Sequence, residues 1–273
     1  MSSHKRFMLC IAIVLTVAGT RSTTAVTLEQ RTIAAFDRYV AETRRQSDPS
    51  LSDPDRFLWV DGDSRGGDVT GLRSGEIVIS RLETKINGKK IDTPDGLVHH
   101  WVGVVFVPGA TVDQAVTLLQ NYDTHGEVYK PNVARSKLIE RDGDRFRIYL
   151  RFYTKKVLTV VVNTEHEARF TRAGSDRAYS RIVSTRIAEL ENPDTPDERE
   201  KPVGNDGGYL WRLNSDWRFL ERDGGTYVQC ESITLTRSVP FGLGLIIRPF
   251  ITGIPRESLM FTLERTRTVL SRR

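Results

Sequence analysis

The sequence predicts an α+β fold, in which a curved antiparallel sheet of six to seven strands wraps around one long C-terminal helix. A helical extension precedes it at the N-terminus. Two observations lead to this prediction. Between residues 133 and 237, apolar side chains recur at every second position, as they do in antiparallel strands with one buried face. Residues 255–273 instead carry apolar side chains at helical spacing. Such a sheet can bury its apolar face by curling round the single helix.

The first 25 residues have the composition of a secretory signal peptide. Lys5 and Arg6 precede an apolar run that is too short for a comfortable membrane span, and small residues follow up to Ala25. We therefore expect an exported protein, periplasmic or secreted, that begins after Ala25. An uncleaved N-terminal anchor is the alternative.

Charge and cysteine content exclude several classes of protein. Without residues 1–25 the chain has 37 Lys plus Arg side chains against 35 Asp plus Glu, a net charge of +2. A nearly neutral protein lacks the basic surface that nucleic acid binding requires, so we expect no nucleic acid partner. Of the 2 cysteines, only Cys230 lies beyond this segment, which excludes an internal disulfide and a cysteine-based metal site in the mature chain.

Residues 26–75 are interpreted as an N-terminal extension. Thr27–Gln30 has the pattern of a capping box, and the apolar spacing that follows predicts an amphipathic helix to about Thr43. Residues 44–75 are rich in Asp, Ser, Gly and Pro, with residues 57–59 as their apolar anchor. We expect this stretch to be a long surface loop.

Residues 76–273 are predicted to form one ligand-binding domain. A capping box at Thr111–Gln114 predicts a short helix between the second and third strands. Residues 191–207 are acidic and rich in proline, which predicts a flexible insertion at an open end of the sheet. The expected strands are residues 76–82, 97–107, 133–140, 145–153, 157–170, 177–190, 209–221 and 226–237.

The C-terminal segment has two parts. Residues 240–254 form an apolar run, which we interpret as a lid over a cavity; the alternative, compatible with the first, is a surface that makes transient contact with a membrane. A helix is expected from Pro255 to the end, with Leu259, Leu263, Thr266 and Leu270 as its buried stripe. The residues expected in the lid or membrane contact are Phe241, Leu243, Leu245, Ile246, Ile247, Arg248 and Phe250.

Several motifs, taken in order, resemble a known family. Val107–Asp113 before a short helix, Asn121–Asp123 after it, and Ile254–Leu259 in the C-terminal helix are similar to the START-like superfamily. This superfamily is also called the polyketide cyclase and lipid transport or SRPBCC group, and its coenzyme Q-binding type is the nearest. The resemblance covers residues 76–273. It implies a helix-grip fold with a deep cavity for a lipid, a quinone-like molecule or a polyketide-like aromatic, but it does not imply one function.

Candidate cavity residues come from two strands and the C-terminal helix. His166 shares a strand face with Val160 and Val162, so we interpret it as a core histidine, with a hydrogen-bonding role in the cavity as the alternative. Trp217 and Phe219 share one face of a later strand and suit an aromatic or isoprenoid ligand. The full set of expected cavity residues is His166, Val160, Val162, Trp217, Phe219, Met260 and Phe261.

The other histidines do not predict a metal site. His99 and His100 are adjacent on a strand, so their side chains point to opposite faces and cannot bind one ion together. His125 follows a helix-ending turn and is interpreted as a surface or capping residue. The sequence has no phosphate-binding loop, no nucleophile elbow and no zinc protease motif. We therefore predict no catalytic residues, no metal and no cofactor.

These observations favour an exported protein that binds or transfers a hydrophobic small molecule without catalysis. Two alternatives stay open. One is a cyclase-like or hydrolytic enzyme that uses the same cavity, with His166 as general base. The other is a module that binds a partner protein through its N-terminal helix. The sequence predicts neither the ligand nor the oligomeric state.

Overall fold

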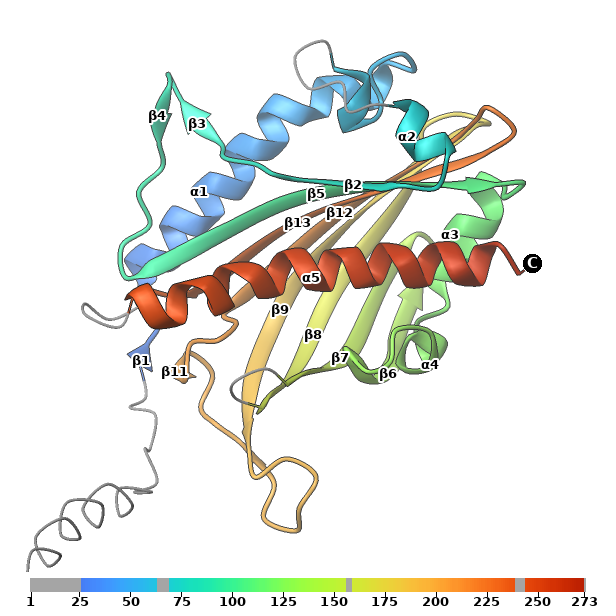
Figure 1. The fold of residues 1–273 in the computed structure, drawn as a ribbon. Helices are drawn as coiled ribbons and strands as arrows, with labels where there is room; N and C mark the ends of the chain where they lie inside the picture. The colour runs from blue at the N-terminus through green and yellow to red at the C-terminus, as the bar shows by residue number, and fades with distance from the viewer. Residues whose placement is uncertain (1–25, 63–68, 156–158, 239–243, 273) are drawn as a thin grey trace, which may run out of the picture.

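A large antiparallel sheet forms the centre of the computed structural model, which describes residues 26–62, 69–155, 159–238 and 244–272 (Figure 1). The predicted signal peptide lies outside these residues. The strands of the sheet are β2 (Ile77–Arg81), β5 (Gly96–Pro108), β6 (Val133–Asp142), β7 (Arg145–Lys155), β8 (Thr159–Arg172), β9 (Arg177–Glu191), β10 (Arg199–Glu200), β12 (Arg212–Arg222) and β13 (Gly225–Arg237).

Strand order in the sheet is β2-β5-β13-β12-β9-β8-β7-β6, with β10 paired to β9. Every neighbouring pair is antiparallel. In the described part of the chain the sheet therefore has 9 strands, more than the six to seven of the fold prediction. Each of the strand ranges expected from the sequence belongs to this sheet, and β10 is an additional short strand from the acidic insertion.

The C-terminal helix α5 (Gly244–Leu270) covers one face of the sheet, which we call the inner face (Figure 1). It lies against β2, β5 and β13. Leu259, Leu263 and Leu270 are buried in the main core, and Thr266 is buried beside them, as the predicted stripe requires. Gly103 of β5 permits close approach, because a Cβ there would lie 2.5 Å from Cδ1 of Leu263. The predicted helix-grip fold is confirmed.

The start of α5 differs from the prediction. We expected Pro255 as its first residue, whereas the helix begins at Gly244. Pro249 and Pro255 therefore lie inside the helix, where each lacks the N–H that would bond to a carbonyl one turn earlier. Proline favours the first turn of a helix but is not confined to it. The apolar run before Pro255 is thus partly a continuation of the helix.

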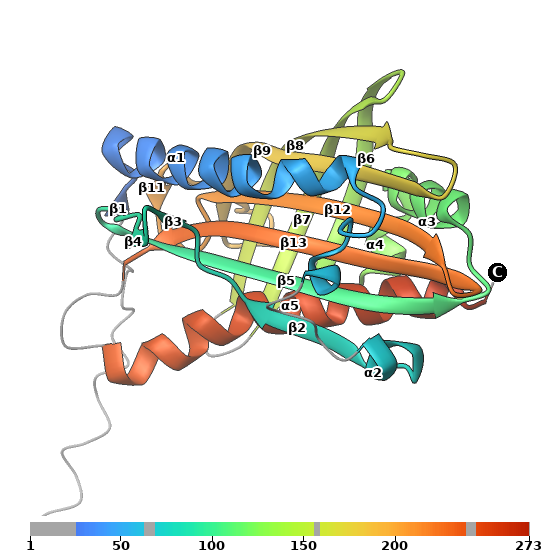
Figure 2. The same cartoon turned by 90° about the horizontal axis from the view of Figure 1, so that it is seen from above.

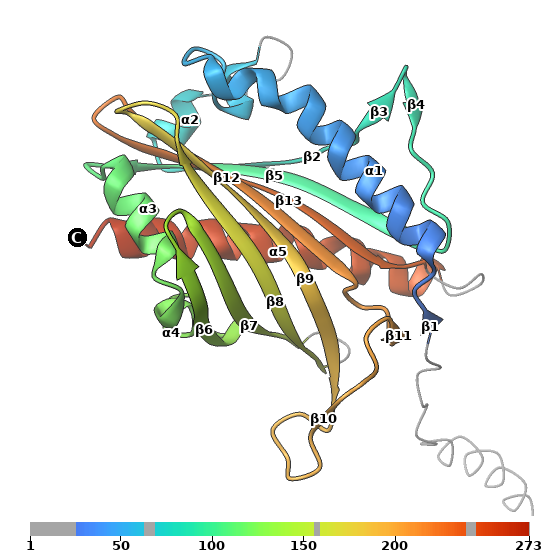
Figure 3. The same cartoon turned by 180° about the vertical axis from the view of Figure 1, so that it is seen from behind.

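The N-terminal helix α1 (Gln30–Ser47) lies on the opposite, outer face of the sheet (Figures 2 and 3). Its buried residues Phe36, Tyr39 and Val40 form a core cluster with Trp211, Ile233 and Leu235. The capping box predicted at Thr27–Gln30 is wrong, because the N-cap is Glu29 and its side chain makes no capping bond. The second predicted box is present: Thr111 and Gln114 bond reciprocally at the start of α3 (Val112–Gln120).

The described residues of the stretch 44–75, which are 44–62 and 69–75, are not the surface loop that its composition predicts. Phe57, Leu58, Val60 and Leu72 are all buried, and they form a core cluster with residues of β5, β12 and β13 on the outer face. The prediction failed because it used the overall polar composition of the segment, whereas four apolar side chains are enough to bury it against the sheet. The remaining short elements are helix α2 (Val69–Arg73) and two strand pairs, β3 (Lys85–Ile86) with β4 (Lys89–Lys90) and β1 (Val26–Thr27) with β11 (Asn205–Asp206).

A buried polar network joins α1 to the outer face. His100 Nε2 lies 2.7 Å from Glu231 Oε1, and because a carboxylate only accepts, the imidazole donates this bond. The Tyr39 hydroxyl lies 3.0 Å from the other ring nitrogen of His100. Arg218 is also buried and donates to the hydroxyl of Ser50 and the carbonyl of Phe57, each at 2.6 Å. The extension is therefore attached by directional bonds as well as by apolar contact.

The acidic insertion is also bound to the sheet, contrary to the flexible segment expected. Arg151, only 2% exposed at its side chain, forms an ion pair with Glu198. Lys201 forms an ion pair with Glu189, which is also buried. Because a buried charge is costly without a partner, these two pairs hold the insertion against β7 and β9.

Phe57→Ala is expected to lower the free energy of unfolding by about 3–5 kcal/mol, because it empties the space of a fully buried ring. Denaturant unfolding followed by fluorescence measures this change. Ile139→Ala, at an exposed position of β6, serves as control and should change stability by about 0.5 kcal/mol or less. A similar small effect of both substitutions would mean that residues 26–75 do not belong to the folded domain.

Glu231→Gln is expected to lower the free energy of unfolding by about 3 kcal/mol at pH 7, because Arg218 and His100 then face no buried negative charge. Burial by itself raises the pKa of Glu231, but the hydrogen bond from His100 and the charges of His100, Arg218 and Arg44 outweigh it and lower that pKa overall.

A lowered carboxyl pKa contributes stability that is complete above the ordinary value of about 4.3 and is lost as the pH falls through the folded-state value. The difference between wild type and Glu231→Gln should therefore shrink below about pH 4. Glu167→Gln, exposed on β8, is the control. A constant difference from pH 7 to pH 3 would contradict this role of the carboxylate.

Candidate functional site

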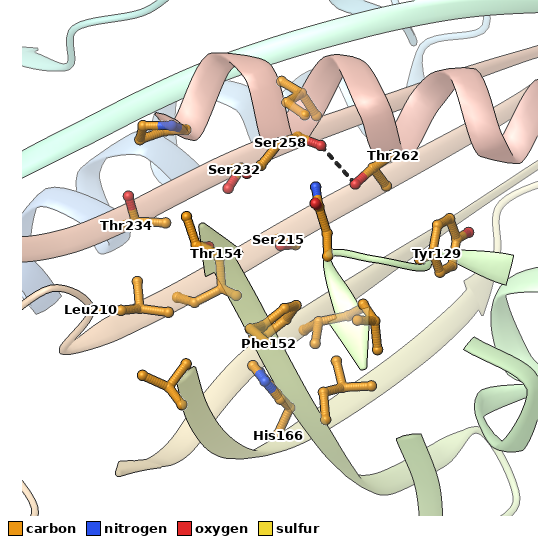
Figure 4. Close-up of a pocket in the computed structure, with 18 of the residues that line it drawn as sticks. Tyr129, Phe152, Thr154, His166, Leu210, Ser215, Ser232, Thr234, Ser258 and Thr262 are labelled. Carbon is orange, nitrogen blue, oxygen red and sulfur yellow. Dashed lines mark hydrogen bonds between the residues drawn. The ribbon is translucent and has the colours of Figure 1, made fainter. Parts of the chain in front are cut away.

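A cavity of ≈ 300 Å³ lies between the inner face of the sheet and α5 (Figure 4). Its walls come from β7, β8, β12 and β13, from α5, and from residues around α3 and α4 (His125–Val128). The space exists because α5 lies against β2, β5 and β13, whereas the inner faces of β12, β8 and β7 extend beyond the helix. This volume is at the lower end of the range for small-molecule sites.

Four of the seven residues predicted to line the cavity do so: Val160, Val162, His166 and Trp217. Phe219 does not. It stacks on Trp217, with ring centroids 6.2 Å apart and the rings 9° from parallel, and lies in the adjacent core. Whether any of the seven contacts a ligand stays a prediction.

Met260 and Phe261 also lie outside the lining. The residues that α5 presents to the cavity are Ile254, Pro255, Ser258, Leu259 and Thr262. At 3.6 residues per turn, Met260 points away from this set, whereas Phe261, three residues after Ser258, lies at its edge. Both are half-buried, and Phe261 packs against the main core.

The structure does not describe the side chains of the predicted lid residues. Phe241 and Leu243 belong to a segment that is not described. Leu245, Ile246, Ile247, Arg248 and Phe250 belong to α5, but only their backbone is described. Their contact with a ligand or a membrane stays a prediction. In the described ranges, no helix has the combined length and apolarity of a membrane span.

Hydroxyl groups line one end of the cavity. Ser215 of β12 lies opposite Ser232 of β13, and Thr234 follows on the same face. Ser258 and Thr262 of α5 approach from the other side, with the Thr262 hydroxyl donating to the Ser258 carbonyl at 2.8 Å (Figure 4). The lining at this end also includes Tyr209 and Arg237. The guanidinium of Arg237 lies 5.6 Å from the centroid of the Tyr209 ring. A polar ligand group would find partners here.

The other end of the cavity is aromatic. Tyr122, His125 and Tyr129 form a row, with centroid distances of 4.9 Å and 5.1 Å between neighbouring rings. His125 was interpreted as a surface or capping residue. The surface role is wrong, because His125 is 4% exposed and burial lowers its pKa to about 4, whereas its hydrogen bonds to the backbone of Leu118 and Leu119, in the last turn of α3, agree with the capping role. Its burial could not be predicted from the sequence, because Asn121–Gly126 has the composition of an exposed turn. The Thr266 hydroxyl donates to the carbonyl of Thr262, so it accepts from the phenol of Tyr129, whose oxygen lies 3.1 Å away.

His166 lies on β8 between the two ends. Its Nε2 is 2.8 Å from Thr164 Oγ1, and its ring meets the ring of Phe152 nearly edge-on at a centroid distance of 6.3 Å. Burial lowers the pKa of His166 from its ordinary 6.5 to about 4. The imidazole is therefore a weak general base at neutral pH, which argues against the enzymatic alternative.

The remaining candidate groups are the two histidines of β5 and Cys230 of β13. His99 and His100 occupy opposite faces as predicted, with His99 Nε2 3.0 Å from Thr236 Oγ1 and His100 bound to Glu231. Cys230 lines the cavity, but burial raises the pKa of its thiol well above the ordinary value, so it is not an activated nucleophile. Among the described residues, no cluster of three or more His, Cys, Asp or Glu could hold a metal ion.

Comparison with known proteins gives a likeness in structure only. No protein-family model and no curated protein matches the sequence. The chain is similar to START-like proteins. One is a STAR-related lipid transfer protein from Xanthomonas axonopodis, at 17% identity over 70% of this chain and 98% of that one, with a TM-score of 0.45.

Two further solved structures are similar to the chain. Human STARD10 is 10% identical over 73% of this chain and 80% of its own, with a TM-score of 0.45. An aromatase/cyclase from Streptomyces sp. R1128 is 12% identical over 65% of this chain and 96% of its own, also with a TM-score of 0.45. The narrower resemblance, to the coenzyme Q-binding type, stays a prediction.

The free energy of unfolding is expected to fall as the pH is lowered from about 6.5 to about 4. His99, His125 and His166 are buried, and burial lowers the pKa of each to about 4. In this window the unfolded chain binds protons that the folded protein excludes, so acid favours unfolding. Denaturant midpoints at half-unit pH steps measure the slope. His166→Leu should make it shallower, and an unchanged slope would contradict a buried neutral His166.

Proposed function

We propose that the protein binds a hydrophobic small molecule in the cavity between the sheet and α5, and carries or transfers it without chemical change. The observation that supports this most is the lining itself: apolar strands on one side, α5 on the other, and polar groups gathered at one end. Small-molecule sites have this composition, because apolar walls supply affinity and a few polar groups set orientation.

The arrangement of the polar groups supports an amphipathic ligand. Its polar groups would find partners at Ser232, Thr234 and Arg237 or at His166, and its apolar part would lie against the apolar lining. Burial of the apolar part would contribute most of the binding free energy, at about 25 cal/mol for each Å² removed from water.

A binding role suits the chemistry of the cavity better than catalysis. The imidazoles and the thiol in its wall are His125 and His166, whose pKa values burial lowers to about 4, and Cys230, whose thiol pKa burial raises. The imidazoles are neutral but only weakly basic, and the thiol stays protonated, so these groups are poorly suited to general base or nucleophilic catalysis at neutral pH.

We further propose that the mature protein is exported and begins after Ala25. The basic start, short apolar run and small-residue end of residues 1–25 support this proposal. A carrier of hydrophobic molecules outside the cytoplasm would shield its cargo from water between membranes.

The proposed function predicts that the purified protein retains a hydrophobic molecule and that filling the cavity abolishes binding. Native mass spectrometry of protein isolated from a membrane-containing extract should show a bound species, released by organic solvent. The mass of the polypeptide in the same spectrum reports cleavage after Ala25. A chain that stays empty when offered lipids and quinones would contradict the proposal.

A cavity-filling substitution provides the matched test. Ser232→Phe puts a ring into the hydroxyl end and should weaken binding of the neutral probe N-phenyl-1-naphthylamine at least about tenfold, since overpacking costs about 1–3 kcal/mol. Glu167→Phe puts the same ring on the exposed side of β8 and should leave probe affinity unchanged. Equal affinities in both variants would place the probe outside the cavity.

A further inference from the structure

Unpaired polar atoms gather in the wall of the cavity. The Tyr122 hydroxyl, His125 Nε2, His166 Nδ1 and Thr234 Oγ1 are all buried, and none has a hydrogen-bond partner among the residues that the structure describes. Buried polar groups in folded proteins are nearly always paired, so each such group needs an explanation. Four of them around one cavity point to a ligand that provides the missing partner.

The hydrogen-bonding direction of His166 can be deduced from its neighbours. The hydroxyl of Thr164 has one hydrogen, which it donates to the carbonyl of Leu150 at 2.9 Å. His166 Nε2 lies 2.8 Å from the same oxygen, so Nε2 carries a hydrogen and donates it to Thr164. A neutral imidazole has a single N–H, which leaves Nδ1 as an acceptor with a free lone pair.

The surroundings of His166 keep the ring in this form. It is 1% exposed, and burial lowers its pKa to about 4, so the ring is neutral at pH 7. Figure 4 shows the imidazole extending from β8 towards Phe152, within the cavity wall. The Thr164 hydroxyl prevents the tautomer from reversing, because its only hydrogen is committed to the backbone.

We infer that the cavity selects a hydrophobic ligand with a hydroxyl group, which donates a hydrogen bond to Nδ1 of His166. This inference rests on the proposed function and narrows its ligand class. An alcohol or a phenol has the required donor. A quinol also has it, whereas the corresponding quinone offers carbonyl acceptors only and would leave Nδ1 unpaired. A carboxylate is likewise unsuited to this position, because it accepts but does not donate.

A matched pair of ligands tests the inference. 4-Octylphenol and 4-octylanisole share their apolar body and differ in the hydrogen-bond donor. Their affinities are measured by displacement of N-phenyl-1-naphthylamine from the wild type, from His166→Leu and from His166→Asn. Leucine removes the acceptor, whereas the side-chain oxygen of asparagine can take the place of Nδ1. The ratio of the two affinities cancels changes in packing that affect both ligands alike.

The wild type should bind the phenol about tenfold more tightly than the anisole, because the ether leaves a buried acceptor unpaired. His166→Leu should reduce this ratio to near one, and His166→Asn should keep most of it. Equal binding of the two ligands by the wild type, or an unchanged ratio in His166→Leu, would overturn the inference but leave the proposed function intact. Failure of a folded wild type to bind the probe or either ligand would overturn both.

Discussion

The difference in width between the sheet and its helix determines the rest of the structure. Strands lie about 4.8 Å apart, so eight of them span roughly 34 Å, whereas an α-helix with its side chains is about 10 Å across. One helix can therefore cover two or three strands, and α5 lies against β2, β5 and β13. The inner faces of the remaining strands need another cover. The short helices α3 and α4 supply part of it, and the uncovered remainder is the cavity.

The same sheet also has a second apolar face, which explains the N-terminal extension. Val104 and Phe106 of β5 point away from α5 and would be exposed without a cover. Phe57 and Leu72 bury them, and α1 does the same for Ile233 and Leu235 of β13. The hydrogen bonds that join Tyr39, His100 and Glu231 fix the position of α1 on this face. The described residues of the extension therefore pack on the same sheet as α5.

The two faces differ in their electrostatics, and this difference bears on function. Charged groups on the outer face are paired: Glu231 with His100, and Arg44 with Asp216 at 2.8 Å. In the cavity wall, burial instead favours the neutral forms of His125, His166 and Cys230. A mostly apolar cavity favours hydrophobic ligands, and the charged Arg237 lies at its hydroxyl end. The polar atoms of the lining then distinguish ligands by their hydrogen-bond donors and acceptors.

The sequence by itself determined the elements, because period-two and helical spacing are local properties. The alternation along β7 and β8, the stripe of Leu259, Leu263 and Leu270, and the capping box at Thr111 are all found where predicted. The tertiary structure decided which residues face the cavity. His125 lines the cavity although the sequence around it has the composition of an exposed turn. Phe219 shares a strand face with Trp217, yet it lies in the packed core and not in the cavity lining. Periodicity identifies the buried face of a strand, but the path of α5 across the sheet divides that face into packed core and empty space.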